Sequence, residues 1–386
     1  MKKPIAIAAL LMGTALPAYA VEDGQLLIWT GANRDKEALE AAVQPFIDDY
    51  GIEVTVEVVD PDLPQKFQQA ASTGDGPDIV MWAHDRFGEW ASGGLIAQVQ
   101  PSAEWAEGVL GTTMDAVTFD GATWGYPVSV EAVHLIYNTD LIDTPPASFE
   151  EIMAMDFDGQ SILWDYNNTY FTMPLLMANG GFAFEKVDGS YDGSSTGVNN
   201  AGAIAGATVL ERLIETGVMP AGVDYGVMDG AMNKGEVAMV LNGPWAWGGL
   251  KASGINFGVA PIPSVDGAGS PPFLGVQAMA INAASPNADL AAELLENYLL
   301  VDEGLGTWNA NGALGALADA SAAAAQDDAN ISGMLEVAAS GVPMPSNPEM
   351  GAFWAAMGPA LTNITSGAQD PATALNDAAA RILGEN

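Results

Sequence analysis

The chain has 386 residues, no cysteine, and 49 acidic side chains against 11 Lys and Arg, which gives a formal net charge of −38. A surface this acidic repels nucleic acid and anionic lipid, so neither is expected as a partner, and no disulfide can form. Hydrophobic residues make up 49% of the chain, so a packed core is expected in place of disorder. Such an acidic composition is typical of adaptation to salt, where ions screen the repulsion between carboxylates.

The first twenty residues have the pattern of a cleavable export signal. Lys2 and Lys3 precede an apolar run from Ile5 to Met12, and residues 18–20, Ala-Tyr-Ala, match the cleavage pattern of signal peptidase. The apolar run is too short for a membrane anchor, which needs about 20 apolar residues. We therefore predict a signal peptide over residues 1–20 and an exported mature chain of 366 residues (386 minus 20), long enough for two domains.

Strand and helix patterns alternate after the signal. Gln25–Thr30 is a short apolar run of strand type, Glu37–Tyr50 has apolar residues at helical spacing, and Ile52–Val58 alternates as a strand does. The order repeats with a helix over Lys66–Ser72 and a strand over Ile79–Trp82. This rhythm predicts an α/β domain with a largely parallel sheet.

The rest of the chain contains two strand-rich stretches, Tyr126–Asn138 and Phe273–Asn282, which are candidate crossings between two lobes. Between and after them the patterns predict a helix over Asn200–Glu215, strands over Val237–Asn242 and Asn256–Val259, a helix over Asn287–Leu299, and helical structure from Ala316 onward. Gly189–Gly197 and Asp266–Gly269 are predicted to be loop tips.

Signals for enzymatic chemistry are weak. The only histidines, His84 and His134, have no nucleophile motif beside them, and we interpret both as hydrogen-bonding structural residues. No histidine pair has the spacing of metal ligands, and residues 74–77 lack the lysine of a phosphate-binding loop. The sequence therefore predicts no catalytic residue, no metal and no cofactor.

Aromatic side chains next to polar ones give a stronger signal. A pyranose ring has an apolar face that a flat aromatic side chain can cover, and hydroxyl groups that charged or amide side chains can bind. Trp82, Asp85 and Arg86 provide this combination at the end of a predicted strand, and Trp245 and Trp354 add further rings. A single tryptophan is more often a core residue, but the charges so close to Trp82 favour a binding site.

The same residues resemble a known family. Similarity to bacterial maltose/maltodextrin-binding proteins is carried by Thr73–Ile79 with Trp82–Gly88, Val130–Ala132, Asn242–Trp247, Ile281–Asn287 and Leu295–Leu300, and it extends from about Gly24 to Ile382. The resemblance implies a two-lobed periplasmic-binding-protein fold, in which each lobe is a mostly parallel sheet flanked by helices and hinge strands join the lobes. Under this interpretation the N-terminal lobe covers residues 21–130 and 276–325, and the C-terminal lobe covers residues 131–275 and 326–386. Hinge segments would fall at Ser129–Val133 and Leu274–Ala278.

The resemblance also implies a function. Members of the family bind an α-glucoside such as maltose or a maltodextrin in the cleft between the lobes, and deliver it to a membrane ATP-binding-cassette importer. A periplasmic location, a monomer and, as a further partner, a chemoreceptor would follow. The ligand-binding residues implied are Asn33, Arg34, Trp82, Ala83, Asp85, Arg86, Glu131, Tyr170, Tyr225, Trp245, Met344 and Trp354.

Several positions depart from the family pattern. Asn33-Arg34 replaces the usual Asp-Lys, acidic contacts fall on Pro64 and Asn168, and an expected arginine falls on Gly358. Arginine keeps the charge of lysine but presents a planar fork of donors. A glucose-type ligand remains favoured, and its length and linkage stay open.

Three alternatives remain. The ligand could be another disaccharide, such as trehalose or sucrose. A glycosidase could use Asp85 and Glu131, although one carboxyl would need a raised pKa and Arg86 beside Asp85 opposes that. The acidic chain could instead capture a cation such as a polyamine or a metal, yet the aromatic residues and Arg86 fit a neutral polyol better.

Overall fold

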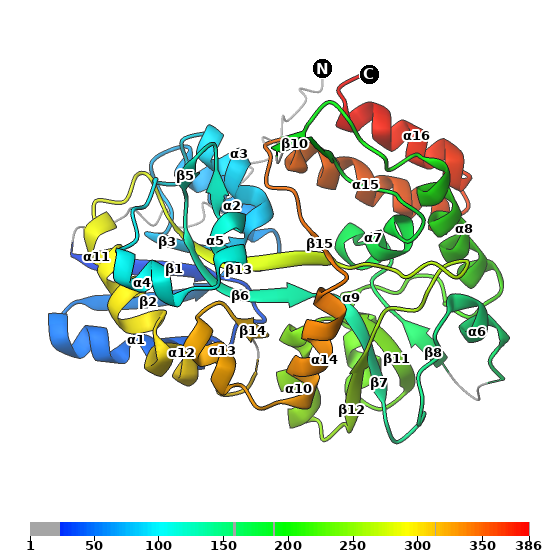
Figure 1. The fold of residues 1–386 in the computed structure, drawn as a ribbon, viewed down its shortest axis with the longest axis horizontal. Coiled ribbons are helices and arrows are strands. Elements are labelled where there is room, and N and C mark those ends of the chain that lie inside the picture. The colour runs from blue at the N-terminus through cyan, green and yellow to red at the C-terminus, as the bar shows by residue number, and fades with distance from the viewer. Residues whose placement is uncertain (1–23, 157–159, 188–189, 313, 386) are drawn as a thin grey trace, which may run out of the picture.

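The computed structural model describes residues 24–156, 160–187, 190–312 and 314–385, so the predicted signal peptide lies outside the described residues. Two lobes lie side by side, each with its own sheet and its own buried core (Figure 1). None of the helices in the described ranges is long and apolar enough to cross a membrane.

The first lobe is built on a sheet with strand order β14-β6-β13-β3-β1-β2, to which β15 is added at β13. Its strands are β1 (Gln25–Thr30), β2 (Glu53–Val58), β3 (Ile79–Ala83), β6 (Tyr126–Ala132), β13 (Phe273–Ile281), β14 (Ala316–Leu317) and β15 (Val342–Pro343), and a small separate pair consists of β4 (Thr118–Phe119) and β5 (Ala122–Thr123). β1 pairs in parallel with β2 and with β3, so these strands end at the same edge.

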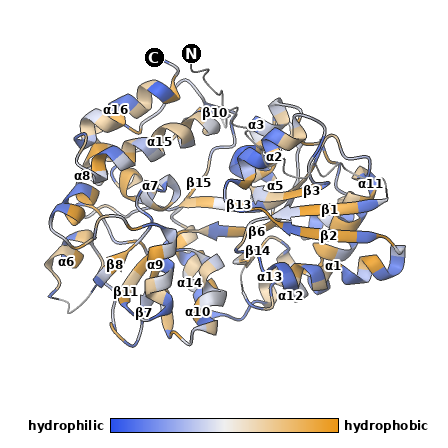
Figure 2. Cartoon of the chain, turned by 180° about the vertical axis from the view of Figure 1, so that it is seen from behind, coloured by the Kyte–Doolittle hydropathy of each residue, from blue (hydrophilic) through white to orange (hydrophobic). Residues whose placement is uncertain are grey.

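Helices cover both faces of this sheet. They are α1 (Lys36–Tyr50), α2 (Leu63–Ala71), the 3-10 helix η1 (His84–Arg86), α3 (Phe87–Ser92), α4 (Ala103–Gly108), α5 (Gly111–Ala116), α11 (Ala288–Leu294), the π-helix η3 (Leu295–Leu299), α12 (Asp302–Trp308) and α13 (Ala320–Ala325). α1 begins where the Asp35 side chain accepts a hydrogen bond from the Ala38 N–H, and it ends at Gly51 in the left-handed conformation. Hydrophobic residues concentrate in strands such as β1 and β13, whereas helices such as α1 carry hydrophilic residues as well (Figure 2).

The second lobe has a sheet with strand order β12-β7-β11-β8. Its strands are β7 (His134–Asn138), β8 (Gln160–Leu163), β11 (Val237–Asn242) and β12 (Phe257–Ala260), and a hairpin consists of β9 (Glu185–Val187) and β10 (Ser190–Asp192). The helices are α6 (Phe149–Ala154), α7 (Thr169–Met177), α8 (Ala201–Glu215), α9 (Tyr225–Asn233), the 3-10 helix η2 (Pro244–Ala246), α10 (Trp247–Ala252), α14 (Ala329–Ala338), α15 (Met350–Thr365) and α16 (Pro371–Ile382).

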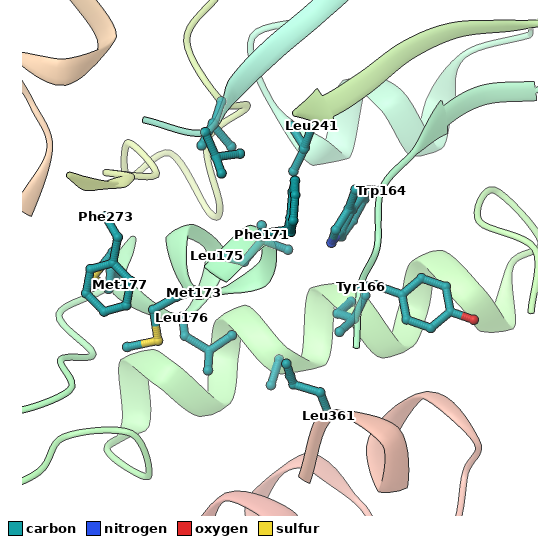
Figure 3. Close-up of a cluster of buried hydrophobic side chains, with 14 of the residues drawn as sticks. Trp164, Tyr166, Phe171, Met173, Leu175, Leu176, Met177, Leu241, Phe273 and Leu361 are labelled. Carbon is teal, nitrogen blue, oxygen red and sulfur yellow. The ribbon is translucent and has the colours of Figure 1, made fainter. Parts of the chain in front are cut away.

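The core of the second lobe is nearly continuous hydrophobic packing around α7. Figure 3 shows side chains from α7, β11 and α15 meeting there, with Trp164 and Leu361 on either side. α7 is buried almost all round, which explains why its sequence has no polar face. The start of this helix, at Thr169, is thereby fixed relative to the sheet.

The chain passes between the lobes in strands that belong to both cores. In β13, Phe273 packs in the core of the second lobe and Met279 in that of the first. Val128 of β6 likewise packs in the first lobe, and Val133, just after β6, packs in the second. β6 and β13 pair with each other, with Val276 opposite Val130.

The two-lobed α/β class is confirmed, and the sheets prove to be mixed. β1, β2 and β3 are parallel, as are β8 and β11, whereas β13 runs antiparallel to both β3 and β6. The reason is that β6 leaves the first lobe and β13 returns to it, so the crossing strands must run in opposite directions.

Most predicted elements are confirmed, some with bounds that differ by one to three residues, and three regions differ in kind. The predicted helix over Asn287–Leu299 is an α-helix, α11, continued by a π-helical turn, η3. The region after Ala316 is not wholly helical, because the short strands β14 and β15 add to the sheet of the first lobe. Of the predicted loop tip over Gly189–Gly197, Gly189 lies outside the described residues, and the rest contains strand β10, which pairs with β9. The strand predicted to start at Asn256 starts at Phe257.

Candidate ligand-binding cleft

A cleft of about 690 Å³ is lined by residues of both lobes and of the strands that join them. On the first lobe it is reached by the segments that follow β1, β2 and β3, because parallel strands present their carboxyl ends at one edge of a sheet. All of the predicted site residues line it: Asn33, Arg34, Trp82, Ala83, Asp85, Arg86, Glu131, Tyr170, Tyr225, Trp245, Met344 and Trp354.

An ion pair lies in the cleft beside the strands that connect the lobes. Both terminal nitrogens of Arg34 contact the carboxylate of Glu131, and Arg34 Nη2 donates to Glu131 Oε2 at 3.0 Å. Gln277 Nε2 on β13 donates to the same oxygen at 3.0 Å. The Glu131 side chain is 2% exposed and Arg34 is 13% exposed, so the pair and Gln277 join the loop after β1 to the connecting strands β6 and β13 in a largely dry setting.

Asp85 lines the cleft from the middle of η1. It is 3% exposed, and Trp354 Nε1 on α15 donates to its Oδ2 at 2.8 Å. Burial raises the pKa of Asp85 to about 6, although the neighbouring Arg86 charge and the Trp354 hydrogen bond lower it. Arg86 opposes a raised pKa, as expected, but loss of hydration outweighs the attraction of one guanidinium.

Aromatic rings form the opposite wall. Tyr170 and Phe171 come from the first turn of α7, Tyr225 begins α9, and Trp245 lies in η2 directly after β11. The Trp245 ring centroid lies 6.1 Å from those of Tyr170 and Phe171. Burial raises the pKa of Tyr225 to about 12 and raises that of Tyr170 further, so both hydroxyls stay protonated and can donate to a ligand.

Tryptophans complete the cleft on either side. Trp82 and Trp354 are both only partly buried, and both line this cavity. Trp354 packs edge-on against Phe353, with ring centroids 4.9 Å apart. The composition argument that a tryptophan is more often a core residue holds for Trp90, Trp164, Trp247 and Trp308, which are fully buried.

Further lining residues were not predicted from the sequence. The loop after β2 provides Val59–Asp62, and α2 provides Leu63 and Gln65. The other lining residues not predicted are Gly31, Ala32, Met81, Phe171, Gly275 and Gln277. A Cβ at Gly275 would lie 3.3 Å from Met344 Cε, so the small residue leaves room for the Met344 side chain. The position of the loop directly after a parallel strand is the signal that could have indicated it.

Some of the residues that depart from the family pattern line the cleft. Pro64 and Asn168 both line it, whereas Gly358 on α15 is not among the lining residues. Asn168 also caps α7, since its Oδ1 accepts a hydrogen bond from the Tyr170 N–H at 3.1 Å. The amide at this position therefore fixes the aromatic wall at its root.

Both histidines are structural, as predicted. His84 Nε2 lies 3.0 Å from the Met344 carbonyl oxygen, and its Nδ1 accepts a hydrogen bond from the Val276 N–H at 3.0 Å, which ties η1 to the hinge strand. His134 Nδ1 lies 2.9 Å from the Ala132 carbonyl oxygen. Burial lowers the pKa of each histidine to about 4, so both are neutral near pH 7.

Comparison with known proteins decides the family. The model of the family "bacterial extracellular solute-binding protein" matches residues 33–304. The chain belongs to this family. The matched range contains the segments that follow β1, β2 and β3 and both strand stretches that cross between the lobes.

Several curated relatives carry names that state a ligand. The chain is 27% identical over 380 residues to the galactooligosaccharide-binding protein of Bacillus subtilis, covering 94% of this chain and 89% of the relative. It is 28% identical over 363 residues to the maltodextrin-binding protein MdxE of the same species, covering 86% and 84%. It is 26% identical over 319 residues to the maltotriose-binding protein of Pyrococcus abyssi, covering 79% and 69%.

Proposed function

We propose that this solute-binding protein captures an α-glucoside of the maltodextrin type in the cleft between its lobes. The observation that carries the proposal is the pairing of two unlike walls across one cavity. Aromatic rings of the second lobe face fixed polar groups of the first, which is the combination that a pyranose requires. Relatives named for maltodextrin and maltotriose, aligned over most of the chain, support the same class of ligand.

The polar wall favours a neutral ligand. Arg34 is neutralised by Glu131, and the remaining charged lining residues are Arg86, Asp60, Asp62 and Asp85. An anionic sugar would meet more carboxylates than guanidinium groups there. A polyamine would be attracted by the same carboxylates, so the case for a neutral polyol rests on flat ring faces that lie beside paired donors and acceptors.

A galactooligosaccharide is the second candidate. The relative with that name aligns over 94% of this chain, a larger share than either maltodextrin-related protein. Both candidates are oligosaccharides with stackable ring faces, and their glucose and galactose units differ in the orientation of the C4 hydroxyl. Polar groups such as Asp85 and Glu131 would have to distinguish that orientation, because aromatic stacking tolerates both.

A calorimetric screen tests the proposed ligand. Maltose, maltotriose, galactobiose, trehalose, sucrose and spermidine are titrated into the protein under identical salt conditions. We expect maltotriose to bind with the highest affinity. Binding of galactobiose alone would favour the second candidate, and binding of spermidine in the absence of any sugar would contradict both.

Delivery would follow closure of the lobes about their connecting strands. We infer lobe boundaries at residues 130/131, 275/276 and 325/326, supported by the change of core that β13 and β6 undergo along their length. A ligand that contacts both walls stabilises the closed arrangement, and an importer of the ATP-binding-cassette class could then select it. Scattering profiles with and without saturating maltotriose are expected to differ, and identical profiles would contradict closure.

Binding without catalysis fits the geometry better than hydrolysis. The Glu131 carboxylate is engaged by Arg34 and Gln277, which leaves it poorly placed to attack a sugar carbon. The raised pKa of Asp85 would suit a general acid, but hydrolysis also needs a second carboxylate that is free to act as nucleophile or base. Glu131 is not free to do so. Long incubation with maltotriose is expected to release no glucose, and any release would favour a glycosidase.

Export to the outside of the cytoplasmic membrane is part of the proposal. The family is described as extracellular, and the Lys2–Ala20 segment has the pattern of a cleavable signal. We infer a monomer that docks on the membrane importer, with a chemoreceptor as a further partner. N-terminal sequencing of the protein from the periplasm is expected to begin at Val21.

A further inference from the structure

Glu89 lies one turn after Arg86 and outside the lining of the cleft. Its Oε2 is 2.9 Å from Arg86 Nη2, and its Oε1 accepts a hydrogen bond from Gln68 Nε2 on α2 at 3.0 Å. The Arg86 side chain is 8% exposed and the Glu89 side chain 23% exposed. The guanidinium therefore has its opposite charge behind it, on the side away from the ligand.

The Glu89 carboxylate also touches the helix that carries Trp354. A Cβ at Gly351, in the first turn of α15, would lie 2.9 Å from Glu89 Oε2. At Gly88 a Cβ would lie 1.8 Å from the Ser346 carbonyl oxygen, so only glycine permits this approach of α3 to the segment before α15. A carboxylate at the N-terminal turn of a helix is also favoured by the helix dipole.

Two contacts therefore connect the same short segment to α15. Glu89 meets the first turn of α15, and Asp85 accepts a hydrogen bond from Trp354 about one turn further along. Arg86 lies between Asp85 and Glu89 in the chain, and its Nε has no hydrogen-bond partner among the described residues. Without Glu89, the Arg86 guanidinium would keep Asp85 as its neighbouring carboxylate in this segment and could shift from its place in the cleft wall.

We propose that Glu89 is a positioning residue that fixes the Arg86 guanidinium in the cleft wall and aligns it with Trp354. The inference rests on the proposed function, because it assumes that Arg86 and Trp354 contact the bound sugar. Glu89 itself touches no ligand. Glu89 gives the Arg86 guanidinium a second carboxylate besides Asp85. Its contact with the first turn of α15 also fixes the distance between α3 and α15.

The first test measures affinity for maltotriose by calorimetry. Glu89→Gln removes the charge at constant volume, and we expect the dissociation constant to rise about tenfold. Glu89→Asp keeps the charge and is expected to recover most of the affinity. Glu40→Gln, which removes the carboxylate of the exposed Lys36–Glu40 pair on α1, is the matched control and should leave affinity unchanged.

Gln68→Met is a second variant that leaves Glu89 in place but removes the hydrogen bond that orients it. A smaller loss of affinity in the same direction is expected. Circular dichroism and urea unfolding identify variants that fail to fold. A Glu89→Gln protein that folds and binds maltotriose as the wild type does would overturn the proposal.

The second test needs no ligand. Trp354 Nε1 donates to Asp85, so the indole N–H signal of Trp354, identified by its loss in Trp354→Phe, should follow the titration of Asp85. The charged or titratable groups that act on Asp85 are Arg86 and Glu89, and Tyr170 faces it from the second lobe. Because Glu89 repels a second negative charge, Glu89→Gln should move the titration midpoint down by about half a pH unit.

The two tests separate the two proposals. If the wild type binds none of the sugars, the proposed function fails, and the indole titration still decides the role of Glu89. A midpoint that is unchanged in Glu89→Gln would show that Glu89 does not act on the Asp85–Arg86 pair and would overturn the inference. A lower midpoint together with weaker binding supports it.

Discussion

The two walls of the cleft are built by different means. On the first lobe, polar side chains follow the ends of parallel strands and are held by other charged groups, as Arg34 is by Glu131. On the second lobe, rings come from the first turns of helices and are held by packing, as Trp245 is by Phe171. The wall on the first lobe therefore presents charged groups in fixed positions, and the wall on the second lobe presents aromatic ring faces in fixed positions.

This difference assigns separate tasks to the two lobes. Hydrogen bonds to hydroxyls depend on direction, so they need donors and acceptors that cannot rotate. Stacking depends on area and tolerates small shifts, so packed rings suffice for it. We expect changes on the polar wall to alter stability, pH dependence and sugar preference, and changes on the aromatic wall to alter affinity for every sugar.

The largest effect is expected from Glu131→Gln on the polar wall. The substitution leaves the Arg34 charge without its partner in a largely buried place, which should lower the free energy of unfolding by about 3 kcal/mol. Urea unfolding measures the loss. Glu40→Gln, in the exposed pair with Lys36, should cost less than about 1 kcal/mol, and equal losses in the two variants would contradict the distinction.

Asp85→Asn should stabilise the protein while weakening binding. The pKa of Asp85 is raised from 3.8 to about 6, so the folded state binds a proton more tightly than the unfolded state between those values. Asp85 therefore makes stability fall as pH rises through that window, and it costs about 3 kcal/mol above it. Asparagine can still accept the Trp354 hydrogen bond without a buried charge, so the variant should be more stable at pH 8.

The two histidines have the opposite effect on stability. Their folded pKa values of about 4 lie below the ordinary 6.5, so the unfolded state binds more protons in that window and stability is lost as pH falls. The difference in free energy of unfolding between Asp85→Asn and the wild type, measured at each pH, isolates the contribution of Asp85, because both proteins keep the two histidines. A stability difference that stays constant from pH 4 to pH 8 would contradict the assignment.

Trp245→Ala tests the aromatic wall. Removal of the ring should weaken binding of maltotriose by about 1–3 kcal/mol while the fold remains intact. Maltose and maltotriose should be affected alike, because stacking reads the ring face and not a single hydroxyl. Tyr50→Ala, at an exposed aromatic residue on α1, serves as the control, and unchanged affinity in Trp245→Ala would remove this ring from the site.

The smallest effect is expected from Asn168→Ala at the root of the aromatic wall. Loss of the cap on α7 should lower the free energy of unfolding by about 1 kcal/mol, and it should weaken binding slightly by loosening Tyr170. Asn168→Asp keeps an acceptor for the same N–H and should restore stability. If Asn168→Ala weakens binding more than Trp245→Ala does, the aromatic wall depends on its cap and not on ring area.

Much of this architecture could be predicted from the sequence. Gln25–Thr30 and Val237–Asn242 are strands with the predicted bounds, because a continuous apolar run between polar segments has few other solutions. The placement of Trp82, Asp85 and Arg86 at the end of a strand followed from the same local pattern. The predicted crossings near residues 130 and 275 correspond to β6 and β13.

Local pattern could not predict what distant parts of the chain do to one another. Trp354 and Asp85 are 269 positions apart and Arg34 and Glu131 are 97 apart, so neither contact has a signal in neighbouring residues. The raised pKa of Asp85 was missed for this reason, since the sequence shows Arg86 beside it but not the depth of burial. The short strand β15 was also missed, because it is a strand only through its pairing with β13.

The amino-acid sequence by itself determined most helices and strands, the two stretches that cross between the lobes, and the aromatic and charged residues at the end of β3, since hydrophobic periodicity and strand ends are local properties. Only the tertiary structure decided how the charges are paired, which tryptophans stay partly exposed, and that Glu89 stands behind Arg86. Electrostatic energy and hydration depend on distance and burial in three dimensions, and those quantities exist only once the chain has folded.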